Sequence, residues 1–199
     1  MTITSEAVKQ LRERSGAGMM DCKKALQETG GDAEKALDYL RKMGMAAASK
    51  RAHRQAAMGR IESYIHPGEQ IGVLVEVNSE TDFVAKTDDF KTFCHEIAMH
   101  IAAARPLAVG EADLDPAAVA REREVLLEQI KQSGKPESLW EKILDGRMKK
   151  FHEEVCLLRQ PWVKDGDRTI EELRKELSGK VGENIVIRRF AVFQVGQSG

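Results

Sequence analysis

The sequence has few cysteines, and they are far apart. Its 199 residues include three, Cys22, Cys94 and Cys156, and no two of them form a CxxC pair. This spacing excludes a zinc knuckle and a thioredoxin-like redox motif. An odd number of cysteines in a chain without an export signal predicts buried, reduced thiols, and an intermolecular disulfide is the minor alternative.

Long apolar runs are also missing. No stretch approaches the roughly 18 consecutive apolar residues that a membrane-spanning helix needs, and a typical run extends only from Ile71 to Val75. The first residues, Met1 to Glu6, lack the basic-then-apolar order of a secretory signal. We therefore expect a cytoplasmic protein with no membrane partner.

Neither sign of charge dominates, and aromatic residues are scarce. The 31 Lys and Arg residues and 32 Asp and Glu residues give a formal net charge of −1, and aromatics make up 5%. Such a balance does not suit a protein that wraps nucleic acid by neutralising phosphates. The basic stretch from Lys50 to Arg60 has no interleaved aromatics for base stacking. We expect no direct nucleic-acid partner, and an RNA-binding or ribosome-associated protein using residues 50–60 is the alternative.

Patterns for catalysis, metals and nucleotides are absent too. The five histidines show no HxxxH or HExxH spacing. Gly16-Ala17-Gly18 follows an expected helix and lacks the spacing of the phosphate-binding loops. A thiol enzyme using Cys94 and His95 is unfavourable, because adjacent residues on a helix do not face each other. We expect no catalytic residues, no metal site and no cofactor.

The chain opens with three short helical segments. Capping residues and stop glycines predict helices from Thr4 to Ser15, from Met19 to Gly30 and from Asp32 to Gly44. Helices this short are marginal alone, so we expect them to pack on one another. The Ala-rich, basic stretch from Met45 to Ala57 is typical of a separate linker helix.

A hairpin and a long helix come next. Strands over 60–66 and 70–77 flank Pro67-Gly68, a pair that favours a tight turn. Apolar residues alternate along the second strand, which predicts that this face lies on the core. Thr87 caps a helix that continues to Arg105-Pro106, and we expect this helix to cover the hairpin. Its apolar stripe is Phe90, Phe93, Cys94, Ile97, Ala98 and Ile101.

The remainder predicts three helices and a strand, which makes the fold class α+β. Asp115-Pro116 begins a helix to about Gln132, with Ser133-Gly134 as its stop. The capping-box spacing of Thr169 and Glu172 opens a short helix that ends at Gly179, and residues 183–195 alternate like a strand. Between them, a helix after Pro136 should turn these residues towards the core: Leu139, Ile143, Met148, Phe151 and Val155.

Two places hold apolar residues that are difficult to bury. Met19 and Met20 are adjacent and point in different directions from a helix start, so at least one should face outwards, although methionine also fills gaps in small bundles. Phe83 follows the polar turn 78–82, where an aromatic either tucks under the next helix or projects as a wedge. The residues alone favour the tuck.

Two long motifs carry a family resemblance. Residues 11–26 (LRERSGAGMMDCKKAL) and 76–86 (EVNSETDFVAK) resemble, in order, the two signatures of the elongation factor Ts family. Shorter matches cover residues 98–102, 133–136, 146–151 and 182–185. The resemblance extends over essentially the whole chain. The family's usual threonine before Gly-Ala-Gly is Ser15 here, and Ala47 replaces a lysine common after the third helix.

The resemblance implies both a fold and a function. Residues 1–53 would form a three-helix domain similar to ubiquitin-associated domains, and residues 54–199 an α+β core of antiparallel sheet and helices that also mediates dimerisation. Family members act as guanine-nucleotide exchange factors for elongation factor Tu. They bind its GDP complex and promote GDP release so that GTP can load.

The resemblance also implies which residues bind the partner. The N-terminal domain would dock on the partner's GTPase domain through Arg12, Met19 and Met20. The segment of Thr81, Asp82, Phe83 and Val84 would insert beside the nucleotide and disturb its Mg²⁺, which favours the wedge for Phe83. Longer members of the family resemble this chain with the core module duplicated, so we expect a symmetric homodimer here.

Overall fold

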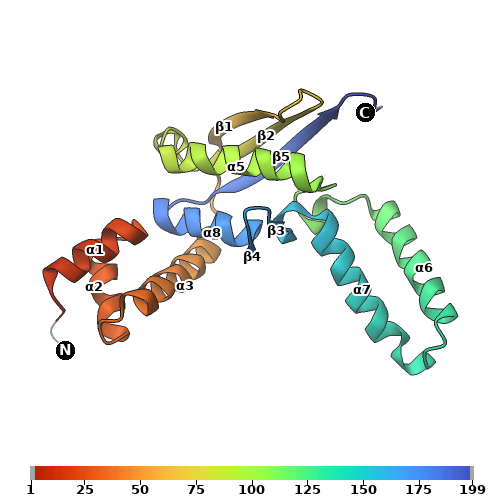
Figure 1. The fold of residues 1–199 in the computed structure, drawn as a ribbon, viewed down its shortest axis with the longest axis horizontal. Coiled ribbons are helices and arrows are strands. Elements are labelled where there is room, and N and C mark those ends of the chain that lie inside the picture. The colour runs from red at the N-terminus through yellow and green to blue at the C-terminus, as the bar shows by residue number, and fades with distance from the viewer. Residues whose placement is uncertain (1–2, 198–199) are drawn as a thin grey trace. The chain divides into compact units, whose positions relative to one another are not determined.

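A computed structural model describes residues 3–197 of the chain. Its α+β fold confirms the predicted class, with helices α1–α3 packed together before an antiparallel sheet with helices (Figure 1). The chain divides into two compact units, each built from separate stretches of sequence. The first comprises residues 1–60, 77–93 and 172–186, and the second comprises 61–76, 94–171 and 187–199.

Helices α1 (Ser5–Ser15), α2 (Met19–Glu28) and α3 (Ala33–Arg51) begin where the sequence predicts. Thr4 caps α1 by accepting a hydrogen bond from the Ala7 amide, and Asp32 caps α3 in the same way. Gly16 ends α1 in the left-handed region, with φ at 66°, which glycine adopts without strain. The three helices share one buried cluster: Val8, Leu11, Cys22, Ala25, Leu26 and Ala36.

The predicted end of the third helix at Gly44 is wrong, and so is the separate linker helix. α3 continues through Gly44 to Arg51. Gly44 faces Gly179, which lies inside α8 (Ile170–Val181) and was also predicted as a helix end. A Cβ atom on Gly179 would lie 2.9 Å from the Gly44 Cα. Both glycines therefore serve a close crossing of two helices, and α8 instead ends near Gly182, whose φ is 79°.

The sheet has three strands in the order β1-β2-β5: β1 (Met58–Ile65), β2 (Ile71–Ser79) and β5 (Val186–Gln194). At the β1–β2 turn the Glu69 amide donates to the His66 carbonyl over 2.9 Å, and Gly68 has φ at 92°. This confirms the predicted Pro-Gly turn. In β2, Val73, Val75 and Val77 are buried as the alternation predicts.

Helix α5 (Asp88–Ala104) carries the predicted apolar stripe, and all six residues of the stripe are buried. Within the second unit, His95 of α5 lies edge-on to Tyr64 of β1, with ring centroids 5.7 Å apart. His100, on the same helix, is fully buried. This contact with β1 agrees with a helix that covers the hairpin.

Helices α6 (Pro116–Gln132) and α7 (Trp140–Val155) pack against each other as a helical hairpin (Figure 1). Leu139 was predicted to face the core, but it lies in the 3₁₀ turn η2 (Glu137–Leu139) before α7 and is 44% exposed. Leu144 is fully buried in its place. The short elements that the sequence did not predict include η1 (Glu111–Asp113), η3 (Leu157–Arg159), β3 (Pro161–Trp162) and β4 (Asp165–Thr169).

Within residues 3–197, no helix combines the length and apolar character needed to cross a membrane.

Candidate functional site

The segment after β2 forms a short, capped helix. Thr81 precedes α4 (Asp82–Ala85), and its hydroxyl accepts a hydrogen bond from the Val84 amide at 3.5 Å. The Ser79 hydroxyl donates to the Thr81 carbonyl over 2.8 Å from a fully buried position. The polar residues before Phe83 therefore build a defined turn at the end of a strand.

Phe83 projects from this turn into solvent. Its side chain is 81% exposed, whereas the following Val84 and Ala85 are buried. In a single helical turn these two residues take the positions that face the core, which leaves Phe83 outside. The tuck that the residues alone favour is therefore wrong, and the chain exposes a large aromatic ring at the end of a braced turn.

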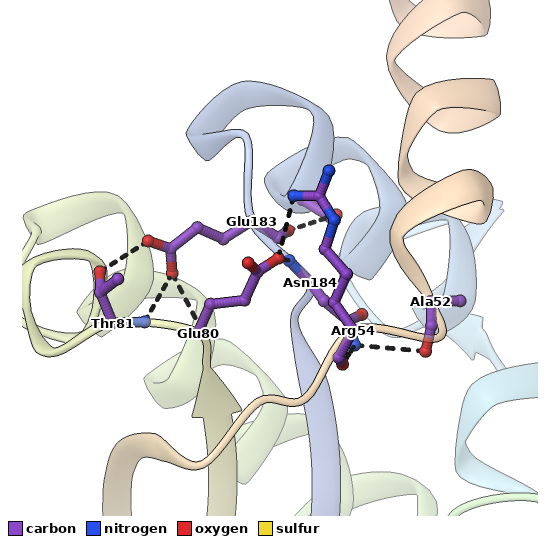
Figure 2. Close-up of polar contacts among 7 residues, drawn as sticks. Ala52, Arg54, Glu80, Thr81, Glu183 and Asn184 are labelled. Atoms are coloured by element: carbon purple, nitrogen blue, oxygen red, sulfur yellow. Dashed lines mark hydrogen bonds and ion pairs between the residues drawn. The ribbon is translucent and has the colours of Figure 1, made fainter.

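Glu183 holds this turn from a loop that lies about a hundred residues away in the sequence. One carboxylate oxygen accepts hydrogen bonds from the amides of Glu80 and Thr81, each at 3.0 Å. The other accepts from the Thr81 hydroxyl at 2.6 Å. Figure 2 shows these three donors converging on a single carboxylate. Charge-assisted hydrogen bonds of this kind are stronger than bonds between neutral groups.

Asn184, the next residue, links the same turn to the segment after α3. Its backbone amide donates to the Glu80 carboxylate at 2.6 Å. Its side-chain amide donates to the carbonyls of Arg54 at 2.8 Å and Ala52 at 3.3 Å (Figure 2). The Arg54 guanidinium lies 3.5 Å from the same Glu80 carboxylate. All of these residues belong to the first unit.

Asp82 presents a carboxylate next to Phe83. It pairs with Lys86, one turn further on, at 2.6 Å. The hydrogen bond and the positive charge of Lys86 lower the pKa of Asp82 below its ordinary value. Both side chains are exposed, so the pair keeps Asp82 ionised but contributes little to stability.

The N-terminal candidates also lie at the surface of the first unit. Met19 and Met20, in the first turn of α2, are 54% and 74% exposed, and Arg12 in the last turn of α1 is exposed. The expectation that at least one methionine faces outwards is confirmed, and gap-filling is wrong for both. Exposed methionines suit an adaptable protein interface.

The thiol and metal alternatives find no geometric support. Cys94 is completely buried, and the ring of His95 lies against Tyr64 and 3.5 Å from the Glu62 carboxylate. Burial, followed by the nearby charge of Glu111, raises the pKa of the Cys156 thiol. In the described part of the chain, no group of three or more His, Cys, Asp or Glu residues is placed to hold a metal ion.

Comparison with known proteins decides the family. Residues 3–180 match the family model described as Elongation factor TS. This chain belongs to the elongation factor Ts family.

Several members of the elongation factor Ts family align with the chain over almost its full length. The elongation factor Ts of Geotalea uraniireducens is 54% identical over 197 residues, which cover 99% of this chain and 91% of that protein. Those of Carboxydothermus hydrogenoformans and Moorella thermoacetica are 55% and 54% identical over 195 residues, covering 98% of this chain and 90% and 96% of theirs.

Elongation factor Ts is the nucleotide exchange factor for elongation factor Tu in translation elongation, a cytoplasmic protein and not an enzyme. Its work is done by binding, so a surface takes the place of a catalytic centre. The two surface regions described above are the candidates for this binding.

Glu183 and Asn184 are the residues to which sequence reasoning assigned no role. Residues 182–185 stood out only as a short match to the family. The one local signal is a polar pair directly after Gly182, where a helix gives way to a strand. Nothing in that signal names partners about a hundred residues earlier in the chain.

Proposed function

We propose that this exchange factor contacts elongation factor Tu at two places. Residues 1–53 form the docking domain and bind the partner's GTPase domain through Arg12, Met19 and Met20. The segment 81–84 inserts beside the bound nucleotide and disturbs the Mg²⁺ there. Residues 54–199 form the core, which also carries the contact between two copies of the chain.

The exposure of Phe83 on a braced turn is the observation that carries this proposal. A fully exposed ring gains about 1.5–3 kcal/mol when it is buried in a pocket. If the pocket exists only when the partner's loops are displaced, that free energy favours the displaced state over the GDP-bound state.

Mg²⁺ makes the nucleotide site sensitive to a small displacement. The ion needs near-ideal octahedral oxygen geometry and is held partly by phosphate oxygens, so moving the surrounding loops weakens metal and diphosphate together. By linkage, the factor and GDP must weaken each other's binding to the same extent. No covalent step is needed, in keeping with a chain whose sequence holds no catalytic pattern.

The alternative role of the basic stretch in RNA binding receives less support. Arg54 has its guanidinium beside Glu80, and its carbonyl accepts from Asn184. A side chain engaged in this way is less available for phosphates, and Arg54 lies in the middle of residues 50–60.

The second proposed partner is another copy of this chain. In the second unit, the sheet carries exposed apolar side chains: in β1, Ile61 and Ile65 lie at exposed positions that alternate with half-buried ones. In β2, the exposed Leu74 lies between the buried Val73 and Val75. A Cβ on Gly72 of β2 would lie 3.1 Å from the Ile65 Cδ1 of β1, so positions 65 and 72 lie on the same face of the sheet. Within the second unit, the large apolar residues exposed on the three strands are Ile61, Ile65, Leu74 and Phe193. An apolar face of this kind suits a self-complementary contact.

Capture of the partner tests the exchange function. The chain is immobilised, loaded with nucleotide-free elongation factor Tu, washed, and challenged with GDP or with ADP as the control nucleotide. We expect GDP to elute the partner and ADP to leave it bound, because GDP and the factor weaken each other's binding. Failure to capture the partner, or retention that GDP does not change, would contradict the proposal.

A further inference from the structure

The loop between α8 and β5 holds the turn that carries Phe83, and hydrogen bonds to the end of α8 hold the loop itself. The Gly182 amide donates a hydrogen bond to the Ser178 carbonyl at 3.0 Å. The Ser178 hydroxyl, which is fully buried, donates to the Glu183 carbonyl at 2.6 Å. We call Glu183 and Asn184 the clamp.

The Glu183 half of the clamp acts on the residues immediately before Phe83. Its carboxylate uses both oxygens to collect the amides of Glu80 and Thr81 and the hydroxyl of Thr81. Thr81 is also the cap of α4. The direction in which α4 leaves the sheet, and with it the position of Phe83, therefore depends on this carboxylate.

The Asn184 half acts on the segment that follows α3. Only the NH₂ end of an amide side chain can face two carbonyl oxygens, so the contacts with Ala52 and Arg54 fix its orientation. The backbone amide of the same residue reaches Glu80. Two adjacent residues thus tie the end of the N-terminal helices to the turn of Phe83.

We propose that Glu183 and Asn184 are positioning residues for nucleotide exchange. By holding the Phe83 turn in one conformation and tying it to the segment after α3, the clamp presents the ring at a set distance from the docking helices. Binding energy is then used to displace the partner's loops and not to order the turn. The inference rests on the proposed role of Phe83, and it adds residues that touch neither the partner's nucleotide nor its metal.

The test compares Glu183→Ala, Glu183→Gln and wild type in stopped-flow release of fluorescent GDP from elongation factor Tu, over a range of factor concentrations. We expect Glu183→Ala to lower the saturating rate roughly 10- to 100-fold, the cost of a misplaced group, while the half-saturating concentration changes little. Glu183→Gln should recover most of the rate, because its amide oxygen still accepts from the two backbone amides. Glu176→Ala is the matched control, since it removes an equal charge from α8 in the same unit, where Glu176 forms an ion pair with Arg41.

Hydrogen exchange supplies a readout on the chain without its partner. The amides of Glu80 and Thr81 should lose protection in Glu183→Ala and keep it in Glu176→Ala. If Glu183→Ala is unfolded at the assay temperature, Glu183→Asp carries the test, because it keeps the charge but shortens the reach by one methylene. We expect Glu183→Asp to lower the saturating rate of GDP release as well.

Phe83→Ala, measured in parallel, separates the clamp from the proposed function. If Phe83→Ala lowers the saturating rate of GDP release and Glu183→Ala does not, the clamp is overturned and the role of Phe83 is left intact. A wild-type rate for Phe83→Ala overturns both. A Glu183→Ala variant that changes only the half-saturating concentration also overturns the clamp, since its effect would then lie in docking.

Discussion

Asn184 shows how much depends on the chemistry of a single buried atom. Replacing it with aspartate keeps the size of the side chain but turns an oxygen towards the carbonyls of Ala52 and Arg54, where the NH₂ group donates. Asn184 is 2% exposed, so water cannot relieve the repulsion. We expect Asn184→Asp to lower the free energy of unfolding by about 2–3 kcal/mol, measured by urea denaturation.

The half-buried Asn78 provides the control, since its side chain donates to the Met58 carbonyl at 3.1 Å. Water can reach this position, so Asn78→Asp should cost about 1 kcal/mol or less. Equal losses for the two variants would count against the special role of Asn184.

His100 leads to a prediction about how the stability of the chain depends on pH. The Val163 amide donates to its Nδ1 at 3.3 Å, so its Nε2 must donate to the Gln160 Oε1 at 3.0 Å, and the ring is neutral. Burial lowers the pKa of His100 below its ordinary value of 6.5. The unfolded chain therefore takes up this proton first as the pH falls. The contribution of His100 to stability is full above about pH 6.5 and is lost below it.

Urea denaturation between pH 7.5 and pH 5 measures this effect. Wild type should lose stability faster on acidification than His100→Gln, which cannot take up a proton at this position. Parallel curves for the two proteins would rule out His100 as a source of the acid sensitivity.

At the scale of elements, the crossing of α3 and α8 makes Gly44 and Gly179 differ in how well they tolerate a side chain. An alanine Cβ at Gly179 would lie 2.9 to 3.0 Å from backbone atoms of Gly44, whereas one at Gly44 would lie 3.7 Å from the Gly179 Cα, an ordinary contact. We expect Gly179→Ala to destabilise the chain by about 1–3 kcal/mol and Gly44→Ala to be close to neutral. Thermal unfolding followed by circular dichroism measures both.

Gly146 of α7 is the reference for this comparison, because a Cβ there meets nothing within 4 Å. Gly146→Ala should raise stability by about 0.5–1 kcal/mol. A Gly179→Ala variant as stable as Gly146→Ala would mean that the two helices do not cross this closely.

The same glycines mark the limit of prediction from the sequence. Caps and periodicity predicted α1, α2, α5 and α6 because the signals lie within a few residues of each element. A glycine that ends a helix and a glycine that lets another helix approach look alike in the sequence, so the prediction failed at Gly44 and Gly179.

The candidate site was predictable to a similar degree. The motif at residues 81–84 was found, but the exposure of Phe83 came from the resemblance and not from its neighbours. The role of Glu183 depends on pairing across about a hundred residues, which local patterns do not encode.

For the whole molecule, the apolar face of the sheet predicts a dimer. Sedimentation at micromolar concentration should give twice the 22.2 kDa of the chain. Phe193, which is 66% exposed on β5, would be buried between two copies, so Phe193→Asp should shift the protein to the monomer. Leu107 is also exposed but lies outside the strands of the sheet, and Leu107→Asp should leave the mass unchanged. A single species of one-chain mass for wild type would refute the dimer.

The central claim is that an exposed ring on a braced turn drives the release of GDP. Phe83→Ala removes the ring, and Val84 and Ala85 still hold the turn on the core, so the fold should persist. The most direct measurement is the rate of fluorescent GDP release from elongation factor Tu at saturating concentrations of wild type and of Phe83→Ala. The account predicts a rate roughly tenfold lower or more for the variant, since about 1.4 kcal/mol of the free energy of a buried ring corresponds to a factor of ten. An unchanged saturating rate would contradict it.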